Sequence, residues 1–269
     1  MAKLKDKLWL WGQTAGTHTI FPENIFGLPK QSRMTPLEGC VYMDIPNVCR
    51  VVMAGQPKAD EFEQEMLPLQ SLKKVIWSIV GDCDSKGYKD GANDLHAVLR
   101  LAEKNENIVG GVLDDILNVA RRDVFTPERI QEYADKLHQA KRPLQLWAVL
   151  YEIELFDWAI PYLQACDVVT FWTWFGKNLD CLEENVKTVR KMFPDKSICV
   201  GVYMWDYGEH KPLSNERMQS QLDCVYRLLK NKDIDGVIIC SNCIADIGLE
   251  AVEVTRKWIK ERGEEELAD

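Results

Sequence analysis

The chain has 269 residues and a net charge of −9, with 46% hydrophobic and 28% charged residues, a composition typical of a globular protein with a sizeable core. An acidic chain is repelled by nucleic acids and by anionic membrane surfaces, so we expect neither as a partner. The sequence starts without a secretory cleavage signal, contains no run of roughly 18 apolar residues that could cross a membrane, and has nine unevenly spaced cysteines. We therefore expect a cytoplasmic protein with reduced thiols.

Short, nearly continuous apolar runs recur along the chain. Strands that are covered on both faces have this pattern, and the strands of parallel sheets are covered on both faces. The predicted strands are Leu8–Gln13, Cys49–Ala54, Val75–Val80, Ile108–Asp114, Gln145–Tyr151, Val168–Trp174, Ile198–Trp205 and Gly236–Ser241.

Helical patterns separate these strands. Thr35 and Glu38 have the spacing of a capping box and Pro36 occupies the first helical position, so the long segment after the first strand also contains a helix. The predicted helices are Pro36–Met43, Lys58–Leu72, Asn93–Lys104, Thr126 to about Gln139, Phe156–Leu163, Asn178–Met192, Asn215–Leu229 and Leu249–Arg262.

This alternation of strands and helices predicts a single (β/α)8 TIM barrel over residues 1–269. A doubly wound open sheet is the main alternative, but such a sheet usually has a Gly-rich phosphate turn after its first strand, and Trp11–Thr17 lacks that motif. Active sites of barrels lie at the carboxyl ends of the strands. Residues 14–34, which we call the first βα loop, are therefore predicted to be an active-site loop.

Tryptophans and carboxylates gather at the predicted strand ends. Sugar rings stack on indole faces, and their hydroxyl groups bond to carboxylates and amides, so this combination favours a small-molecule or oligosaccharide substrate. The expected substrate-binding residues are Trp11, Gln13, His18, Asp82, Asp115, Glu154, Trp172, Trp174, Tyr203, Trp205, Asp206 and Asn242. Glu23, Asp84 and His210 lie in the same loops.

Asp114 and Glu152 are the predicted catalytic pair. Asp114 shares a strand face with Gly110 and Val112, and strand alternation places that face inside the barrel. Glycoside cleavage needs one carboxyl group as general acid and another as nucleophile or base. We expect Asp114 to be the nucleophile or base and Glu152 the general acid, with no cofactor and with Asp115 either orienting the pair or capping the next segment.

Two segments resemble known sugar-binding barrels. Gly110-Gly-Val-Leu-Asp-Asp115 is similar to a strand of several TIM-barrel glycoside hydrolase families and their uncharacterised relatives. In those families the first aspartate of the pair is often catalytic, and the resemblance assigns that role to Asp114. Trp205-Asp206-Tyr207 also resembles a sugar-site strand. The whole chain resembles an uncharacterised bacterial family of barrel proteins.

Several alternatives stay open at this stage. Asp114, Asp115 and Glu152 could bind Mg²⁺ in a metal-dependent sugar isomerase or lyase. A barrel that binds carbohydrate without cleaving it is a third possibility. Cys240 and Cys243 form a CxxC pair that we interpret as small residues closing a strand rather than as a redox or metal site.

Overall fold

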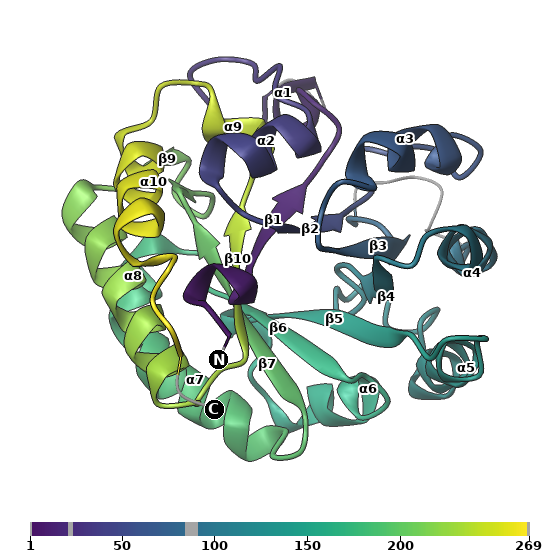
Figure 1. Ribbon diagram of the computed structural model, residues 1–269. Helices are drawn as coiled ribbons and strands as arrows, with labels where there is room; N and C mark the ends of the chain where they lie inside the picture. The colour runs from purple at the N-terminus through teal and green to yellow at the C-terminus, as the bar shows by residue number, and fades with distance from the viewer. Residues whose placement is uncertain (1, 21–23, 84–90, 268–269) are drawn as a thin grey trace.

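Eight parallel strands close into a barrel in the computed structural model, which describes residues 2–20, 24–83 and 91–267 (Figure 1). Around the barrel the strands follow the order β1, β10, β7, β6, β5, β4, β3 and β2. Their bounds are β1 Leu8–Gly12, β2 Asn47–Arg50, β3 Lys74–Val80, β4 Ile108–Leu113, β5 Gln145–Tyr151, β6 Val168–Trp172, β7 Ser197–Tyr203 and β10 Gly236–Cys240. The predicted fold class, a (β/α)8 TIM barrel, is confirmed.

Helices surround the barrel on its outside (Figure 1). The capping box predicted at Thr35 is present, because its hydroxyl accepts the Glu38 N–H at 3.3 Å and the Glu38 carboxylate accepts the Thr35 N–H at 2.8 Å. The helices are α1 Thr17–Ile20, α2 Pro36–Met43, α3 Phe62–Leu69, α4 Leu95–Lys104, α5 Pro127–His138, α6 Ile160–Leu163, α7 Leu182–Met192, α8 Asn215–Lys230, α9 Asn242–Ala245 and α10 Glu250–Arg262.

The second strand begins and ends earlier than the predicted Cys49–Ala54. The Asn47 side chain donates a hydrogen bond to the carbonyl oxygen of Leu8 at 2.8 Å, and Asn47 itself pairs with Trp9 of β1. After Arg50 the chain turns, and Ala54 adopts a positive φ of 54°. Pairing with β1 therefore sets the start of β2, and this turn ends it.

The seventh strand also differs from its prediction, which continued to Trp205. The barrel strand ends at Tyr203, and the next residues form a separate antiparallel pair, β8 Trp205–Asp206 with β9 Lys211–Pro212. This hairpin rises from the carboxyl end of β7 and belongs to the mouth of the barrel.

Tryptophan rings fill much of the barrel interior. Trp9 of β1 lies 4.9 Å from Trp147 of β5, and Trp11 of β1 lies 5.1 Å from Trp172 of β6, measured between ring centroids. Strands so far apart in the barrel order can share these contacts only through the inside. Trp172 also covers Gly201 of β7, where a Cβ atom would come within 1.9 Å of the indole ring. Position 201 therefore requires glycine, because any larger residue would collide with the Trp172 indole.

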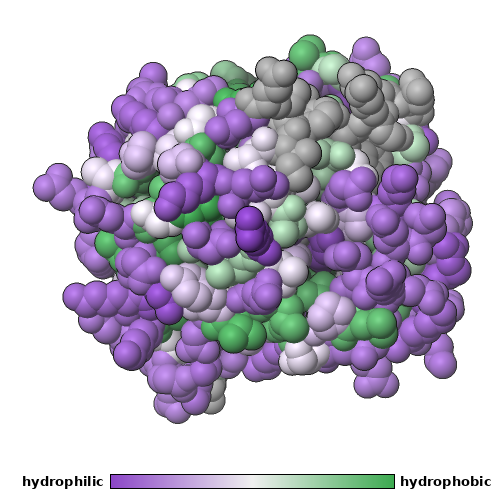
Figure 2. Space-filling view, turned by 90° about the horizontal axis from the view of Figure 1, so that it is seen from above, coloured by the Kyte–Doolittle hydropathy of each residue, from purple (hydrophilic) through white to green (hydrophobic). Residues whose placement is uncertain are grey.

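The two ends of the described chain lie side by side (Figure 1). The N–H of Leu4 donates to the carbonyl oxygen of Glu265 at 2.8 Å, and that of Leu267 donates to Ala2 at 2.9 Å. Hydrophilic residues dominate the face seen in Figure 2, and hydrophobic residues form separate small areas on it. None of the helices formed by the described residues has the length and apolar character that a bilayer crossing requires.

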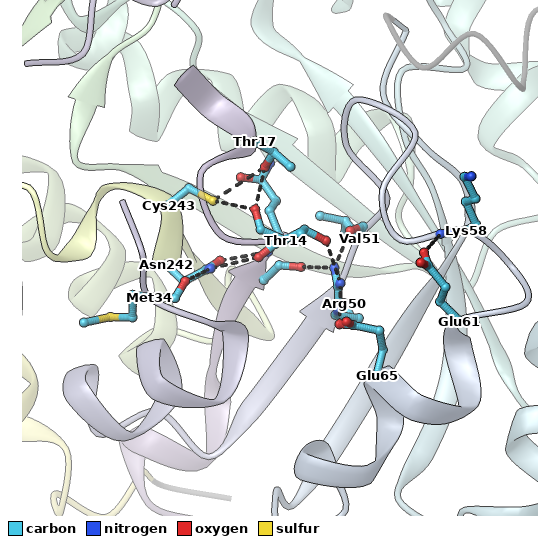
Figure 3. Close-up of polar contacts among 12 residues, drawn as sticks. Thr14, Thr17, Met34, Arg50, Val51, Lys58, Glu61, Glu65, Asn242 and Cys243 are labelled. Carbon is cyan, nitrogen blue, oxygen red and sulfur yellow. Dashed lines mark hydrogen bonds and ion pairs between the residues drawn. The ribbon is translucent and has the colours of Figure 1, made fainter. Parts of the chain in front are cut away.

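A buried arginine fixes the chain that follows β1 (Figure 3). Arg50 of β2 donates to the carbonyl oxygens of Gly12 and Val51 at 3.3 and 2.8 Å. Its guanidinium also donates to the Thr14 hydroxyl at 2.9 Å and to the Glu65 carboxylate at 2.8 Å. Burial lowers the pKa of Arg50, and the Glu65 charge opposes that shift. Arg50 therefore joins β2, α3 and the start of the first βα loop.

Candidate active site

A cavity of about 310 Å³ lies at the carboxyl ends of the barrel strands. Each barrel strand, or the loop that follows it, contributes at least one residue to the walls. The lining consists of Trp11, Gln13, His18, Ile25, Phe26, Met53, Asp82, Cys83, Asp114, Asp115, Tyr151, Trp174, Tyr203, Tyr207, His210 and Cys240. This is the end of the barrel at which enzymes of this fold place their active sites.

The cavity brings together only part of the predicted site. The predicted residues in its lining are Trp11, Gln13, His18, Asp82, Asp114, Asp115, Trp174 and Tyr203. The predicted residues outside its lining are Glu152, Glu154, Trp172, Trp205, Asp206 and Asn242. Glu23 and Asp84 lie outside the described residues.

Three carboxyl groups occupy the side of the cavity formed by β3 and β4. Asp115 adopts a left-handed conformation with φ of 50°, a region in which aspartate is more common than most residues. Strand alternation no longer applies there, so the side chains of both Asp114 and Asp115 face the cavity. The Asp115 carboxylate accepts the Cys83 N–H at 3.0 Å, and the Asp82 carboxylate accepts the Ala54 N–H at 3.0 Å.

Asp114 has the most strongly shifted acidity of this group. Its burial raises the pKa of the carboxyl well above the usual range, and the charges of Asp115 and Asp82 raise it further. A hydrogen bond with the Asp115 carboxyl acts in the same direction, and only the Arg121 charge opposes these effects. Asp114 therefore keeps its proton at a pH at which an exposed aspartate would have lost it.

Arg121 connects the backbone segments that follow β3 and β4. Its buried guanidinium donates to the carbonyl oxygens of Gly81 at 2.6 Å, Asp82 at 2.5 Å and Asp114 at 3.1 Å. These three bonds tie the loop after β3 to the loop after β4. They fix the backbone from which the Asp82 and Asp114 carboxyl groups enter the cavity.

Aromatic rings form the opposite wall. Trp174 lies 5.7 Å from Tyr151, 5.9 Å from Tyr203 and 5.5 Å from Tyr207 between ring centroids. Burial raises the pKa of all three tyrosine hydroxyls well above the usual value. The phenols therefore stay protonated and can donate hydrogen bonds to a ligand.

The first βα loop covers part of the cavity. Its residues His18, Ile25 and Phe26 belong to the lining. The Phe26 carbonyl oxygen accepts a hydrogen bond from Trp205 Nε1 at 3.0 Å, and His18 Nδ1 lies 3.3 Å from the Tyr207 hydroxyl. Burial lowers the pKa of His18 to about 3, so the imidazole is neutral near pH 7. The three lining residues of this loop thus form a neutral and largely apolar part of the cavity wall.

The two glutamates after β5 bind the protein's own backbone. The Glu152 carboxylate accepts the N–H groups of Trp174 and Phe175 at 2.8 and 3.2 Å and the Asn178 amide at 3.3 Å. Glu154 accepts the Tyr151 N–H at 3.0 Å, and burial raises its pKa to about 7. Glu152 therefore positions the loop that carries Trp174, and Glu154 caps the end of β5.

Three other predicted residues hold the mouth in shape. Trp205 bonds to the backbone of the first βα loop as described above, and the Asp206 carboxylate accepts the Glu209 N–H at 3.0 Å within the β8–β9 hairpin. Asn242 donates to the carbonyl oxygens of Gln13 and Met34 at 2.8 and 2.7 Å and accepts the Gln13 N–H at 2.8 Å (Figure 3). Both amide hydrogens of Asn242 are used in this way, so neither is available to a ligand.

Cysteines near the cavity are free thiols. Burial raises the pKa of Cys240 and of Cys243, and the Cys243 thiol donates to the Thr14 carbonyl oxygen at 3.2 Å. Within residues 2–20, 24–83 and 91–267, no group of three or more histidine, cysteine or acidic side chains has an arrangement that could hold a metal ion.

Tyr151 and Tyr207 line the cavity but were not among the predicted substrate-binding residues, although Tyr207 belongs to the segment that resembles a sugar-site strand. Both were recognised as lying near strand ends, but residue type gave no reason to prefer them over the neighbouring carboxylates and tryptophans. Their ring contacts with Trp174 are what identify them.

Comparison with known proteins finds no matching family model and no matching curated protein. Solved glycoside hydrolases are similar to the chain in fold. An α-L-arabinofuranosidase from Thermotoga maritima has a TM-score of 0.58 at 12% identity, over 94% of this chain and 70% of that one. A GH113 β-1,4-mannanase has a TM-score of 0.56 at 11% identity, over 97% and 100% of the two chains. A family 5 glycoside hydrolase from Prevotella bryantii has 0.54 at 11%, over 97% and 98%. The predicted resemblance to TIM-barrel glycoside hydrolases is confirmed at the level of the fold.

Proposed function

We propose that the protein is a glycoside hydrolase and that the reaction takes place in the cavity at the carboxyl end of the barrel. The observation that carries this proposal is the meeting of Asp82, Asp114 and Asp115 with an aromatic wall in one cavity. Carboxyl groups are the groups that glycoside cleavage requires, and flat aromatic rings suit the faces of a sugar. The solved structures of similar fold are enzymes that act on glycosides, which supports the same class of substrate.

Asp114 is the general acid in this proposal. A general acid has to carry its proton near neutral pH, and burial together with the neighbouring carboxyl groups raises the pKa of Asp114. The sequence suggested Glu152 for this role, but its carboxylate is engaged by three donors of the loop after β6. We therefore assign proton donation to the glycosidic oxygen to Asp114.

Asp82 is the carboxylate that attacks the anomeric carbon or activates water. Retaining and inverting enzymes keep this group about 5–5.5 Å or about 6.5–9.5 Å from the acid. Asp115 follows Asp114 in the chain, and its carboxyl raises the pKa of Asp114 through its charge and through hydrogen bonding, so we assign it a supporting role. Asp82 lies at the end of the neighbouring strand and interacts with Asp114 through its charge. Asp115 then serves to orient Asp114 and to keep it protonated.

Aryl glycosides test these assignments. The panel contains the 4-nitrophenyl and 2,4-dinitrophenyl derivatives of α-L-arabinofuranose, β-D-mannose and β-D-glucose, and Asp114→Asn is compared with the unchanged protein. Removing a general acid should slow turnover of the poorer 4-nitrophenyl leaving group by about 10²–10⁴-fold. The 2,4-dinitrophenyl substrate should be much less affected, because its leaving group departs without a proton.

Asp195→Asn is the matched control, since Asp195 is exposed and lies before β7 at the other end of the barrel. It should leave both rates unchanged. Asp82→Ala should slow both leaving groups alike and should regain turnover with azide. Equal losses on both substrates in Asp114→Asn would remove Asp114 from proton donation, and full activity in that variant would remove it from the reaction.

A further inference from the structure

The described residues of the first βα loop, 14–20 and 24–34, form a wall along one side of the cavity, to which His18, Ile25 and Phe26 contribute. The loop leaves β1, yet the Phe26 ring lies 5.1 Å from Tyr207, which follows β7, and 6.3 Å from Trp174, which follows β6. In the barrel order β10 and β7 separate β1 from β6. The loop's described residues therefore extend over the carboxyl ends of β10 and β7, where the Thr17 hydroxyl lies 3.6 Å from the Cys243 thiol and His18 Nδ1 lies 3.3 Å from the Tyr207 hydroxyl.

This wall is packed and hydrogen-bonded. Within it, the Asn24 side chain bonds to both the N–H and the carbonyl oxygen of Leu28, at 2.9 and 2.8 Å. At its far end, the Ser32 hydroxyl donates to the Asn242 carbonyl oxygen at 3.1 Å and the Arg33 N–H donates to the Asp246 carboxylate at 3.0 Å. The wall is thus joined to the loop after β10 and is part of the folded barrel mouth.

The cavity is also small. Its volume of about 310 Å³ is at the lower end of the range of roughly 300–1,000 Å³ that is usual for small-molecule sites. An enzyme that cuts inside a polysaccharide has to hold sugar units on both sides of the broken bond. Phe26 of this wall packs on Tyr207 and Trp174 and bounds the cavity on the side of β6 and β7, which leaves less room there for a second sugar unit.

The charged residues of the lining further restrict the kind of sugar that the cavity can accept. Asp82, Asp114 and Asp115 supply carboxyl groups, and the lining formed by the described residues contains no lysine or arginine. A sugar that carries a carboxylate or phosphate would face these carboxyl groups with no lysine or arginine among the described lining residues to neutralise it, which is unfavourable at short range.

From these observations we infer that the cavity takes one neutral terminal sugar unit and that the enzyme releases monosaccharides from a chain end. This inference rests on the proposed function. In the complex, the terminal unit packs against Phe26, Tyr207 and Trp174. Its glycosidic bond faces the carboxyl groups on the side of β3 and β4.

Matched substrates with free and blocked ends test the inference. For each sugar of the panel that is turned over, a reducing-end-labelled tetrasaccharide is offered with the hydroxyl groups of its terminal non-reducing unit either free or blocked as methyl ethers. We expect monosaccharide as the first product of the free chain and a rate at least about tenfold lower for the blocked chain. A uronic acid glycoside should be turned over at least about tenfold more slowly than its neutral counterpart.

A variant of the wall tests whether steric exclusion by the wall causes the slower turnover of blocked chains. Phe26→Ala removes a ring that bounds the cavity, and it should raise the ratio of blocked to free turnover by at least about tenfold. Phe156→Ala is the control, since Phe156 is 59% exposed and lies outside the cavity lining. It should leave the ratio unchanged.

The possible results distinguish this inference from the proposed function. Internal fragments as first products, or equal rates for blocked and free chains, would overturn the inference and leave hydrolysis itself supported. Absence of turnover on every aryl glycoside and chain would overturn the proposed function and the inference with it. Calorimetry adds a measurement without turnover, because affinity that keeps rising from monosaccharide to tetrasaccharide contradicts a site for one terminal unit.

Discussion

Asn242 provides a direct test of how the mouth of the barrel is held. Its side chain bonds to the Gln13 N–H and to the carbonyl oxygens of Gln13 and Met34, at the two ends of the first βα loop. Asn242→Ala leaves these three backbone groups without their partner. Each buried group that loses its partner costs about 1–3 kcal/mol, and water entering the opened space recovers part of this. We therefore expect the free energy of unfolding to fall by about 3–5 kcal/mol.

Urea unfolding followed by tryptophan fluorescence measures this change. Asn215→Ala is the control, because the exposed Asn215 amide bonds only to the Glu250 carboxylate in the described structure, and its loss should cost less than about 0.5 kcal/mol. Asn242→Asp keeps the shape but points an acceptor at two carbonyl oxygens, so its destabilisation should be larger at pH 8 than at pH 4. A free energy of unfolding for Asn242→Ala within about 0.5 kcal/mol of the unchanged protein would refute the reasoning.

Three further predictions concern Glu154, Gly201 and Asp115. The pKa of Glu154 rises from 4.5 to about 7 on folding, so the folded state binds more protons in that window and stability falls as the pH rises through it. Glu154→Gln should therefore leave the urea midpoint unchanged at pH 4 and raise stability by about 1–2 kcal/mol at pH 8, and no gain at pH 8 would count against a buried carboxyl. Gly201→Ala places a Cβ atom within 1.9 Å of the Trp172 ring and should lower the thermal midpoint, with a cost of about 3 kcal/mol, so an unchanged midpoint would contradict this packing. Asp115→Asn removes a charge that raises the pKa of Asp114, so the alkaline limb of the kcat profile should move down by about one pH unit; an unmoved limb would indicate another general acid.

The barrel could be predicted from the sequence because its strands are buried on both faces. Ile108 and Val112, for example, belong to a nearly continuous apolar run, which is typical of a strand covered on both faces. The structure places both residues, fully buried, in β4 as predicted. Strand ends were harder to predict. The end of β2 depends on a turn at Ala54, and the end of β7 depends on pairing between Trp205 and Pro212. These partners are set by the tertiary structure and leave no periodic signal.

The candidate site could be predicted less completely than the fold. The order of strand ends placed Asp82, Asp114 and Asp115 on one rim, but it could not tell which polar side chains would turn toward the backbone. Glu152 satisfies the N–H groups of Trp174 and Phe175, which belong to the next strand end. A carboxylate in a ligand site and one that supports a loop look alike in a sequence.

Trp172 shows the same difficulty for aromatic residues. It shares a strand phase with Trp174, so the sequence favoured a sugar platform for both. The structure places Trp172 inside the barrel over Gly201 and Trp174 at the cavity wall. The glycine that makes room for the Trp172 indole lies on the next strand, and nothing near Trp172 in the sequence points to it.

The bonds between Asn242 and Gln13 join residues that are 229 positions apart in the chain. They lie where β1 pairs with β10, the seam at which the first and last strands close the barrel. The entropy of closing such a long loop has to be lost before these contacts can compensate for it, so they form later in folding than local contacts do. The cavity should consequently be absent from partly folded species in which the seam is open, so ligand binding reports on completion of the barrel rather than on formation of its individual βα units.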